Sequence, residues 1–156
     1  MEIEIKKYRR QGNGVLYKLS PNIPLTIKNT KLMFLPENYR DLFYIKLKVN
    51  HSEGVKDIIS LEECIKEYFS NENEYIFESN FHNRPNYPLM LQTRYQANKG
   101  EPLIINESTQ SVIEYLSNNM DSLYNVTVEI GNIFLNSDKK KINYFLNITN
   151  IKLVHT

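Results

Sequence analysis

The sequence has little of the chemistry by which enzymes are usually recognised. Its single cysteine, Cys64, cannot form an internal disulfide, and there is no CxxC, HExxH or GxSxG motif and no glycine-rich phosphate loop. The three histidines, His51, His82 and His155, are scattered singly and match no metal or triad spacing. We therefore expect no cofactor, no metal and no catalytic centre, and interpret the chain as a protein that is not an enzyme.

Long apolar runs are also missing. No stretch of about 18 apolar residues occurs that could span a membrane. The first residues, MEIEIKKYRR, alternate apolar and charged side chains and lack the apolar core of a signal peptide. Together with the single cysteine, this predicts a cytoplasmic protein with no membrane contact. A length of 156 residues fits one domain, so we expect residues 1–156 to fold as a unit.

Alanine is almost absent, occurring only as Ala97, whereas Asn, Ile and Lys are frequent. This bias is typical of an AT-rich coding sequence. It indicates a virus, a plasmid or an AT-rich microbe as the source, and by itself says nothing of function.

Charge is nearly balanced overall but unevenly distributed. The net charge is +1, yet residues 1–50 carry +6, residues 51–80 carry −6 and residues 81–156 carry +1. Such asymmetry is compatible with a nucleic-acid face and a separate second face. It is equally compatible with two stretches of ordinary solvated surface.

Strand patterns dominate the chain. Alternating residues 2–8 and 14–19 flank the turn QGNG and predict a hairpin. Further strands are expected at 24–28, 31–35, 42–49, 74–78 and 87–95. Because strands far outnumber helices, the predicted fold is mainly β, an OB-like β-barrel with two helical insertions.

The two helices are expected after residue 60 and over 108–118. Ser60 with Glu63 three residues later resembles a capping box. Apolar residues then recur at helical spacing and predict one buried stripe, with the helix's Glu and Lys residues pointing outward: Leu61, Cys64, Ile65, Tyr68 and Phe69. In the second helix we expect Val112, Ile113 and Leu116 to face inward.

Residues 124–154 predict a long terminal hairpin. If Asn136 faces Lys141 across the turn, the apolar residues of both strands match in register, with Ile133 opposite Tyr144. The alternation changes phase at Gly131-Asn132 and again at Thr149-Asn150, which is typical of β-bulges that bend strands. Phe134 and Phe145 then fall on the otherwise polar face.

Aromatic and basic residues occur together at several places, as single-strand nucleic-acid binding requires, since cations neutralise phosphates and aromatic rings stack on bases. Tyr44 alternates with Lys46 and Lys48, and three lysines form the hairpin turn. Two further clusters are Lys6, Tyr8, Arg9 and Arg10, and Arg94, Tyr95 and Lys99. The candidate binding residues are thus Arg9, Arg10, Tyr44, Lys46, Lys48, Arg94, Tyr95, Phe134, Lys139, Lys140, Lys141 and Phe145.

The terminal pattern VxVxIGNIFLN…KKINYFLNITNIKL resembles the closing strands of small single-stranded DNA-binding proteins of DNA viruses, phages and linear plasmid replicons. The resemblance implies an OB-fold. It also implies that Tyr44, Phe134 and Phe145 stack on bases, while Lys46, Lys48 and Lys139–Lys141 meet phosphates, with DNA favoured over RNA. Many such proteins end in an acidic tail that recruits replication proteins, whereas this chain ends in IKLVHT. The acidic segment 51–80 is therefore the candidate surface for such a partner.

Two other classes remain open at this point. A structural or interaction protein would use the face of Phe134 and Phe145 for a homo-oligomer or another partner, and the low net charge favours that class. A small nuclease would need converging carboxylates, for which Asp57, Glu62, Glu63 and Glu67 are the candidates.

Overall fold

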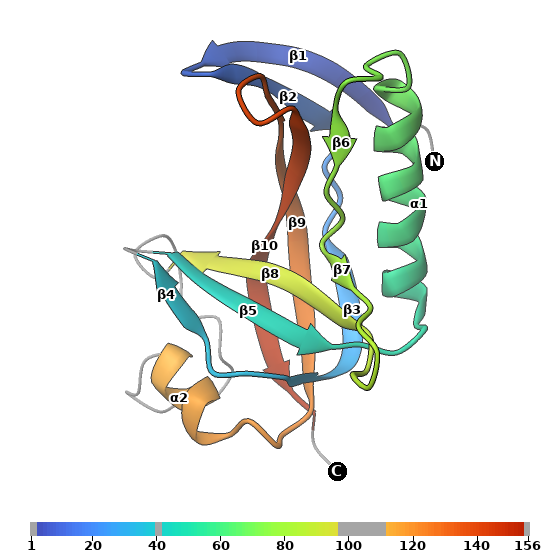
Figure 1. Cartoon of the computed structure of the whole chain (residues 1–156). Helices are drawn as coiled ribbons and strands as arrows, with labels where there is room; N and C mark the ends of the chain where they lie inside the picture. Colours follow the sequence, from blue (N-terminus) through green and yellow to red (C-terminus); the bar gives the residue numbers. More distant parts are fainter. Residues whose placement is uncertain (1–2, 40–41, 97–111, 155–156) are drawn as a thin grey trace.

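The computed structural model describes residues 3–39, 42–96 and 112–154, and within them the chain forms ten strands and two helices (Figure 1). In chain order these are β1 (Glu4–Gln11), β2 (Gly14–Ser20), β3 (Leu25–Leu32), β4 (Glu37–Tyr39), β5 (Leu42–Lys48), α1 (Glu53–Tyr68), β6 (Ile76–Phe77), β7 (Phe81–His82), β8 (Met90–Gln96), α2 (Val112–Asn118), β9 (Tyr124–Asn136) and β10 (Lys141–Leu153). The strands belong to one mixed sheet. The prediction of a mainly β protein with two helices is confirmed.

The β9–β10 hairpin has the register that the sequence predicts. Asn136 faces Lys141, and Ile133 faces Tyr144. The register shifts between Tyr144 and Leu146, where Gly131 and Asn132 of β9 oppose a single residue, and again between Ile148 and Asn150. Both shifts lie where the alternation changes phase, so the two predicted bulges are confirmed. Each bulge bends the hairpin.

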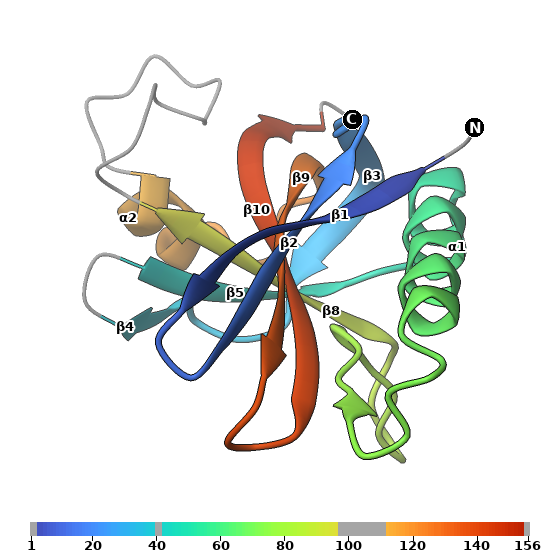
Figure 2. The same ribbon diagram turned by 90° about the horizontal axis from the view of Figure 1, so that it is seen from above.

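The other strands are arranged around this hairpin (Figure 1). β9 pairs with β2 and β3, β3 pairs with β5, β5 pairs with β8, and β8 pairs with β10. β1 extends the sheet beyond β2, and the short β4, β6 and β7 pair with β5, β10 and β8. The pairings of β10 with β8 and with β6 are parallel, whereas the rest are antiparallel. Figure 2 shows the β1–β2 hairpin crossing over the other strands.

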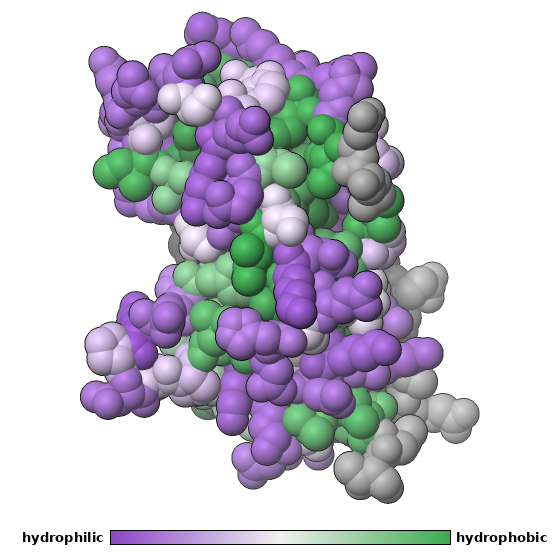
Figure 3. All heavy atoms as spheres, turned by 90° about the vertical axis from the view of Figure 1, so that its right-hand side faces the viewer, coloured by the Kyte–Doolittle hydropathy of each residue, from purple (hydrophilic) through white to green (hydrophobic). Residues whose placement is uncertain are grey.

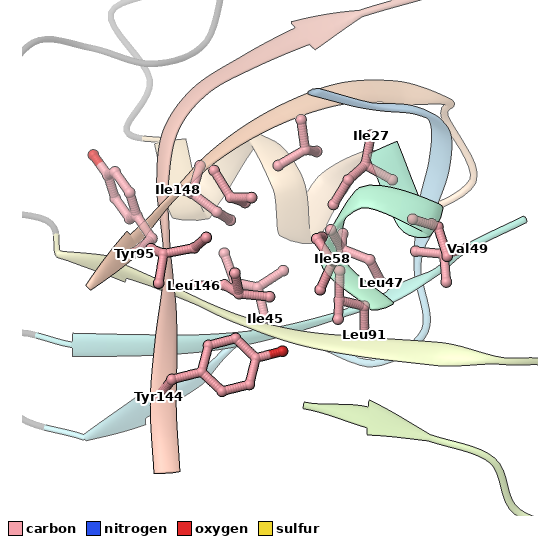
Figure 4. Close-up of a cluster of buried hydrophobic side chains, with 14 of the residues drawn as sticks. Ile27, Ile45, Leu47, Val49, Ile58, Leu91, Tyr95, Tyr144, Leu146 and Ile148 are labelled. Atoms are coloured by element: carbon pink, nitrogen blue, oxygen red, sulfur yellow. The ribbon is translucent and has the colours of Figure 1, made fainter. Parts of the chain in front are cut away.

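The core lies between the inner faces of these strands and α1 (Figure 4). Alternate residues of the strands point into it, such as Ile27, Ile45, Leu91 and Tyr144, and Ile58 of α1 packs against them. Each fully buried side chain of this size contributes about 1.5–3 kcal/mol relative to its exposed state. The apolar residues of the alternating strand patterns thus form the core.

Helix α1 begins eight residues earlier than the sequence predicts. Its N-cap is Ser52, whose side chain accepts a hydrogen bond from the Val55 amide, so the expected capping box at Ser60 is wrong. Gly54 allows the helix to approach β3 closely, because a Cβ there would overlap the Thr26 carbonyl oxygen. Of the expected buried stripe, Leu61, Ile65 and Phe69 are buried, whereas Cys64 and Tyr68 are exposed.

Helix α2 agrees with the prediction where it is described. Val112 and Leu116 are buried and Ile113 packs partly against the core, while Tyr115 is buried as well. Residues 108–111 of the expected helix lie outside the described residues. Neither of the described helices is long and apolar enough to cross a membrane.

The surface on the α1 side is mostly hydrophilic (Figure 3). Apolar residues appear between the polar ones, and the large exposed apolar residues include Ile59 and Tyr68 of α1 and Ile76 of β6. Such scattered apolar side chains are normal on a protein surface. They do not by themselves mark an interface.

One carboxylate of α1 points inward. Glu62 is only 5% exposed and accepts hydrogen bonds from the Tyr144 hydroxyl, from Ser79 Oγ at 2.7 and 2.8 Å and from the Asn80 amide at 3.2 Å. Burial and the nearby carboxylate raise the pKa of Tyr144 far above its usual value, so this hydroxyl stays protonated and donates. Glu62 thus ties α1 to β10 and to the segment before β7. The expectation that all Glu residues of this helix point outward is wrong here.

Replacing Glu62 with Ala should lower the free energy of unfolding by roughly 3 kcal/mol or more, because its donors would be left buried without an acceptor. The measurement is urea unfolding followed by circular dichroism. Glu63→Ala is the matched control, since Glu63 is exposed and contacts Lys66 at the surface. Equal losses in the two variants would contradict the role of Glu62.

Candidate nucleic-acid interface

Two open cavities adjoin at Phe145 of β10. The first, here called the hairpin cavity, has a volume of about 580 Å³ and is lined by residues of β2, β8, β9 and β10. The second, the sheet cavity, has a volume of about 570 Å³ and is lined by residues of β4, β5, β7, β8, β10 and the segment before β7. Phe145 belongs to both linings, so the two cavities form adjoining parts of one surface.

The bulge at Gly131 places Phe145 at this junction. Gly131 and Asn132 oppose Phe145 alone, which is the extra-residue geometry of a β-bulge. A Cβ on Gly131 would lie 2.8 Å from Nδ2 of Asn147, so any other residue there would force that side chain to shift. The local sequence Gly-Asn therefore positions the centre of the surface.

Arg94 covers the Phe145 ring. Its guanidinium carbon lies 3.8 Å from the ring centroid, and its Nε donates a hydrogen bond to Oδ1 of Asn147 at 3.0 Å. Tyr44 faces Arg94 across the β5–β8 pair. Burial lowers the pKa of Arg94, while the charge interaction and hydrogen bond with Tyr44 act in the opposite direction. An arginine remains charged after such a shift, so the junction holds a fixed, partly desolvated cation.

A second aromatic–cation cluster stands beside the hairpin cavity. Lys18, which lines the cavity, places its Nζ 3.8 Å from the centroid of Tyr8, and the guanidinium of Arg9 lies 5.4 Å from the same ring. Tyr8 is 47% exposed and sits at the register shift between Lys7 and Arg9. Arg10 is also exposed on β1. The candidate residues Arg9 and Arg10 therefore lie near one end of the surface.

A third cluster lies beside the sheet cavity. Phe34 and Leu35, in the connection between β3 and β4, are 42% and 61% exposed. Lys46, which lines the sheet cavity, has its Nζ 5.8 Å from the Phe34 centroid. The pattern of residues 31–35 predicts a strand and does not indicate this pair, although the apolar run MFL before Pro36 is a signal for it.

The basic hairpin turn contacts the acidic segment. Lys140 forms an ion pair with Glu74 at 3.5 Å, and Lys141 forms one with Glu78 at 2.6 Å. The four side chains are between 41% and 79% exposed, so each pair contributes no more than about 1 kcal/mol. The turn itself is fixed by Oδ1 of Asn136, which accepts from the Lys139 amide at 3.1 Å. The basic turn and the part of the acidic segment that holds Glu74 and Glu78 thus lie side by side on one surface.

Several other candidates lie away from the cavities. Tyr95 is only 6% exposed and belongs to the core, so its assignment to the binding face is wrong. Phe134 lies against Gly14, where a Cβ would come within 2.5 Å of the ring, and it is absent from both cavity linings. Lys48 is exposed opposite Lys31. Lys99 lies outside the described residues.

The acidic residues form no metal centre in the part of the chain that is described. No three His, Cys, Asp or Glu side chains there are placed to hold a metal ion. Glu62 is a candidate for both a metal site and a partner surface. It is buried and its carboxylate accepts hydrogen bonds from within the protein, so it is not accessible to a metal or a partner.

Comparison with known proteins finds no matching family model, no similar curated protein and no similar solved structure.

Replacing Arg94 with Met should lower the free energy of unfolding by about 1–2 kcal/mol. Met keeps an apolar stem over Phe145 but loses the cation–π contact and the hydrogen bond to Asn147. Thermal and urea unfolding measure the change. Arg84→Met, in an exposed loop, is the control and should be close to neutral. A neutral Arg94→Met would show that Arg94 is not held as described.

Proposed function

We propose that this protein binds single-stranded DNA along the hairpin and sheet cavities, largely without sequence specificity, in the replication or protection of a viral or plasmid-like genome. The observation that carries the proposal is the series of three aromatic–cation pairs along these cavities: Tyr8 with Lys18, Phe145 with Arg94, and Phe34 with Lys46. Cations can follow the phosphates of a strand while flat groups stack on its bases.

The pairing order of the strands supports an OB-like barrel as the framework. β9, β3, β5, β8 and β10 pair in succession, and β10 pairs back with β9. In chain order these would be the five barrel strands. OB-folds bind oligonucleotides on the face of their second and third strands and with the loops between strands 1 and 2 and between strands 4 and 5. Here those would be β5, β8, the connection holding Phe34 and the lysine turn.

At the junction, we assign base stacking mainly to the guanidinium of Arg94 and not to the ring of Phe145. One face of the Phe145 ring already carries the guanidinium. A guanidinium plane can itself stack on a base and still attract the phosphate backbone. Phe145 then acts as a support that holds Arg94 flat, while Tyr44 and Asn147 fix its direction.

This geometry weakens the alternative of an interaction protein that uses the face of Phe134 and Phe145. It required Phe134 and Phe145 to be exposed rings in need of a partner. Phe134 instead lies against Gly14 and Phe145 lies under Arg94. A replication partner would then meet the remaining exposed carboxylates of the acidic segment, such as Glu53, Glu63 and Glu67.

Titration of a fluorescently labelled dT oligomer, with matched duplex as the comparison, tests the proposal. We expect tight, salt-dependent binding of the single strand and weak binding of the duplex. Arg94→Ala should weaken binding about tenfold, since base stacking contributes about 1–3 kcal/mol per base.

Lys18→Ala should flatten the logarithmic salt slope by roughly 0.7, the value for one phosphate on a single strand. Lys56→Ala, exposed on α1 and outside both cavity linings, is the matched control and should leave the slope unchanged. No single-strand binding at low salt would refute the proposal.

A further inference from the structure

The sheet cavity is lined by groups that do not suit a phosphate. Glu37 and Glu78 place two carboxylates on it, beside the single cation Lys46 among its lining residues. Burial, Lys46 and Arg84 lower the pKa of His82, so this lining imidazole is neutral at physiological pH and adds no positive charge. A phosphate group would therefore meet two carboxylates here, whereas N–H groups would find acceptors.

One of these carboxylates is held in a fixed position. Oε1 of Glu78 lies 2.6 Å from Nζ of Lys141, and its Oε2 accepts a hydrogen bond from Nδ2 of Asn143 at 2.9 Å. Each carboxylate oxygen can accept more than one hydrogen bond, so Glu78 keeps acceptor capacity toward the cavity. Glu37 lines the cavity from β4, opposite Tyr44 in the β4–β5 pair.

The adjoining wall is fixed from behind by Glu62. Ser79, Asn80 and Tyr144 line the cavity and all donate to this buried carboxylate. Nδ2 of Asn80 also donates to the Tyr144 carbonyl oxygen at 3.0 Å. A wall held in this way is preorganised, so a ligand does not have to order it on binding.

The cavity therefore offers carboxylate acceptors, one ammonium donor and flat side walls at Tyr44 and Phe145. Its volume of about 570 Å³ is within the usual range of small-ligand sites. Among the bases, guanine alone places two N–H donor groups side by side on its pairing edge, where a carboxylate can accept both. Its O6 and N7 acceptors suit a lysine. Thymine and uracil offer one N–H between two carbonyl oxygens, which a carboxylate repels.

We propose that the sheet cavity holds one guanine base of the bound strand, with Glu37 and Glu78 accepting from its pairing edge and Lys46 donating to O6 or N7. This inference rests on the proposed function. It adds a local base preference to binding that is otherwise governed by the backbone and by stacking.

The test compares labelled single strands of about 15 nucleotides in which every third base is guanine, inosine, cytosine or adenine and the others are thymine. A lithium buffer prevents guanine quadruplexes. Inosine lacks only the 2-amino group of guanine, so the ratio of the two dissociation constants reports that one contact. We expect the guanine strand to bind about tenfold more tightly than the inosine strand, because the inosine strand lacks one hydrogen bond to a carboxylate.

Glu37→Gln and Glu78→Gln should each reduce this ratio toward one. Glu67→Gln, on the exposed surface of α1, removes the same charge and should leave the ratio unchanged. Because a ratio is measured, the general gain in affinity from losing a negative charge cancels. Glu37→Gln remains decisive if Glu78→Gln disturbs the Lys141 contact.

Each other outcome overturns a specific statement. Equal binding of guanine and inosine strands, or tighter binding of cytosine or adenine strands, would refute the guanine site while leaving the proposed function intact. A guanine preference that survives both Glu variants would refute its assignment to this cavity. Failure of every strand to bind would refute the proposed function itself, and the guanine site with it.

Discussion

The antiparallel pairing of β9 with β10 is the constraint on which the rest of the structure depends. β2 and β3 pair with β9, and β6 and β8 pair with β10, so the remaining strands attach to this hairpin directly or through one or two neighbours. Its bulge at Gly131 bends the pair opposite Phe145, whose outward direction follows from the regular alternation of β10. The two cavities lie on either side of that bend.

The parts of the fold that the sequence predicts are those determined by local pattern. The alternation of residues 124–153 determines the hairpin register and both bulges, because apolar residues on the two strands match in only one alignment. The same rule, applied strictly, would also have separated Arg94 from Tyr95. Adjacent residues of a strand point to opposite faces, so the two could not share the binding surface. Tyr95 faces the core and Arg94 faces the hairpin cavity.

The parts that the sequence could not predict depend on contacts between distant segments. Glu62 can be buried because Ser79, Asn80 and Tyr144 donate hydrogen bonds to it. No sequence feature near Glu62 indicates that these residues will contact it. The parallel pairing of β8 with β10 likewise has no local signal. The start of α1 was missed because the sequence Ser-Glu-Gly resembles a turn, although Ser52 is the cap and Gly54 allows close packing.

The fixed position of Arg94 has a consequence for the energetics of association. An arginine loses roughly 2 kcal/mol of rotamer entropy when its side chain is immobilised. Here Phe145, Asn147 and Tyr44 already restrict the guanidinium in the unbound protein. That entropy is lost when the chain folds, so a ligand that meets this guanidinium does not lose it again, and more of the contact energy appears as affinity.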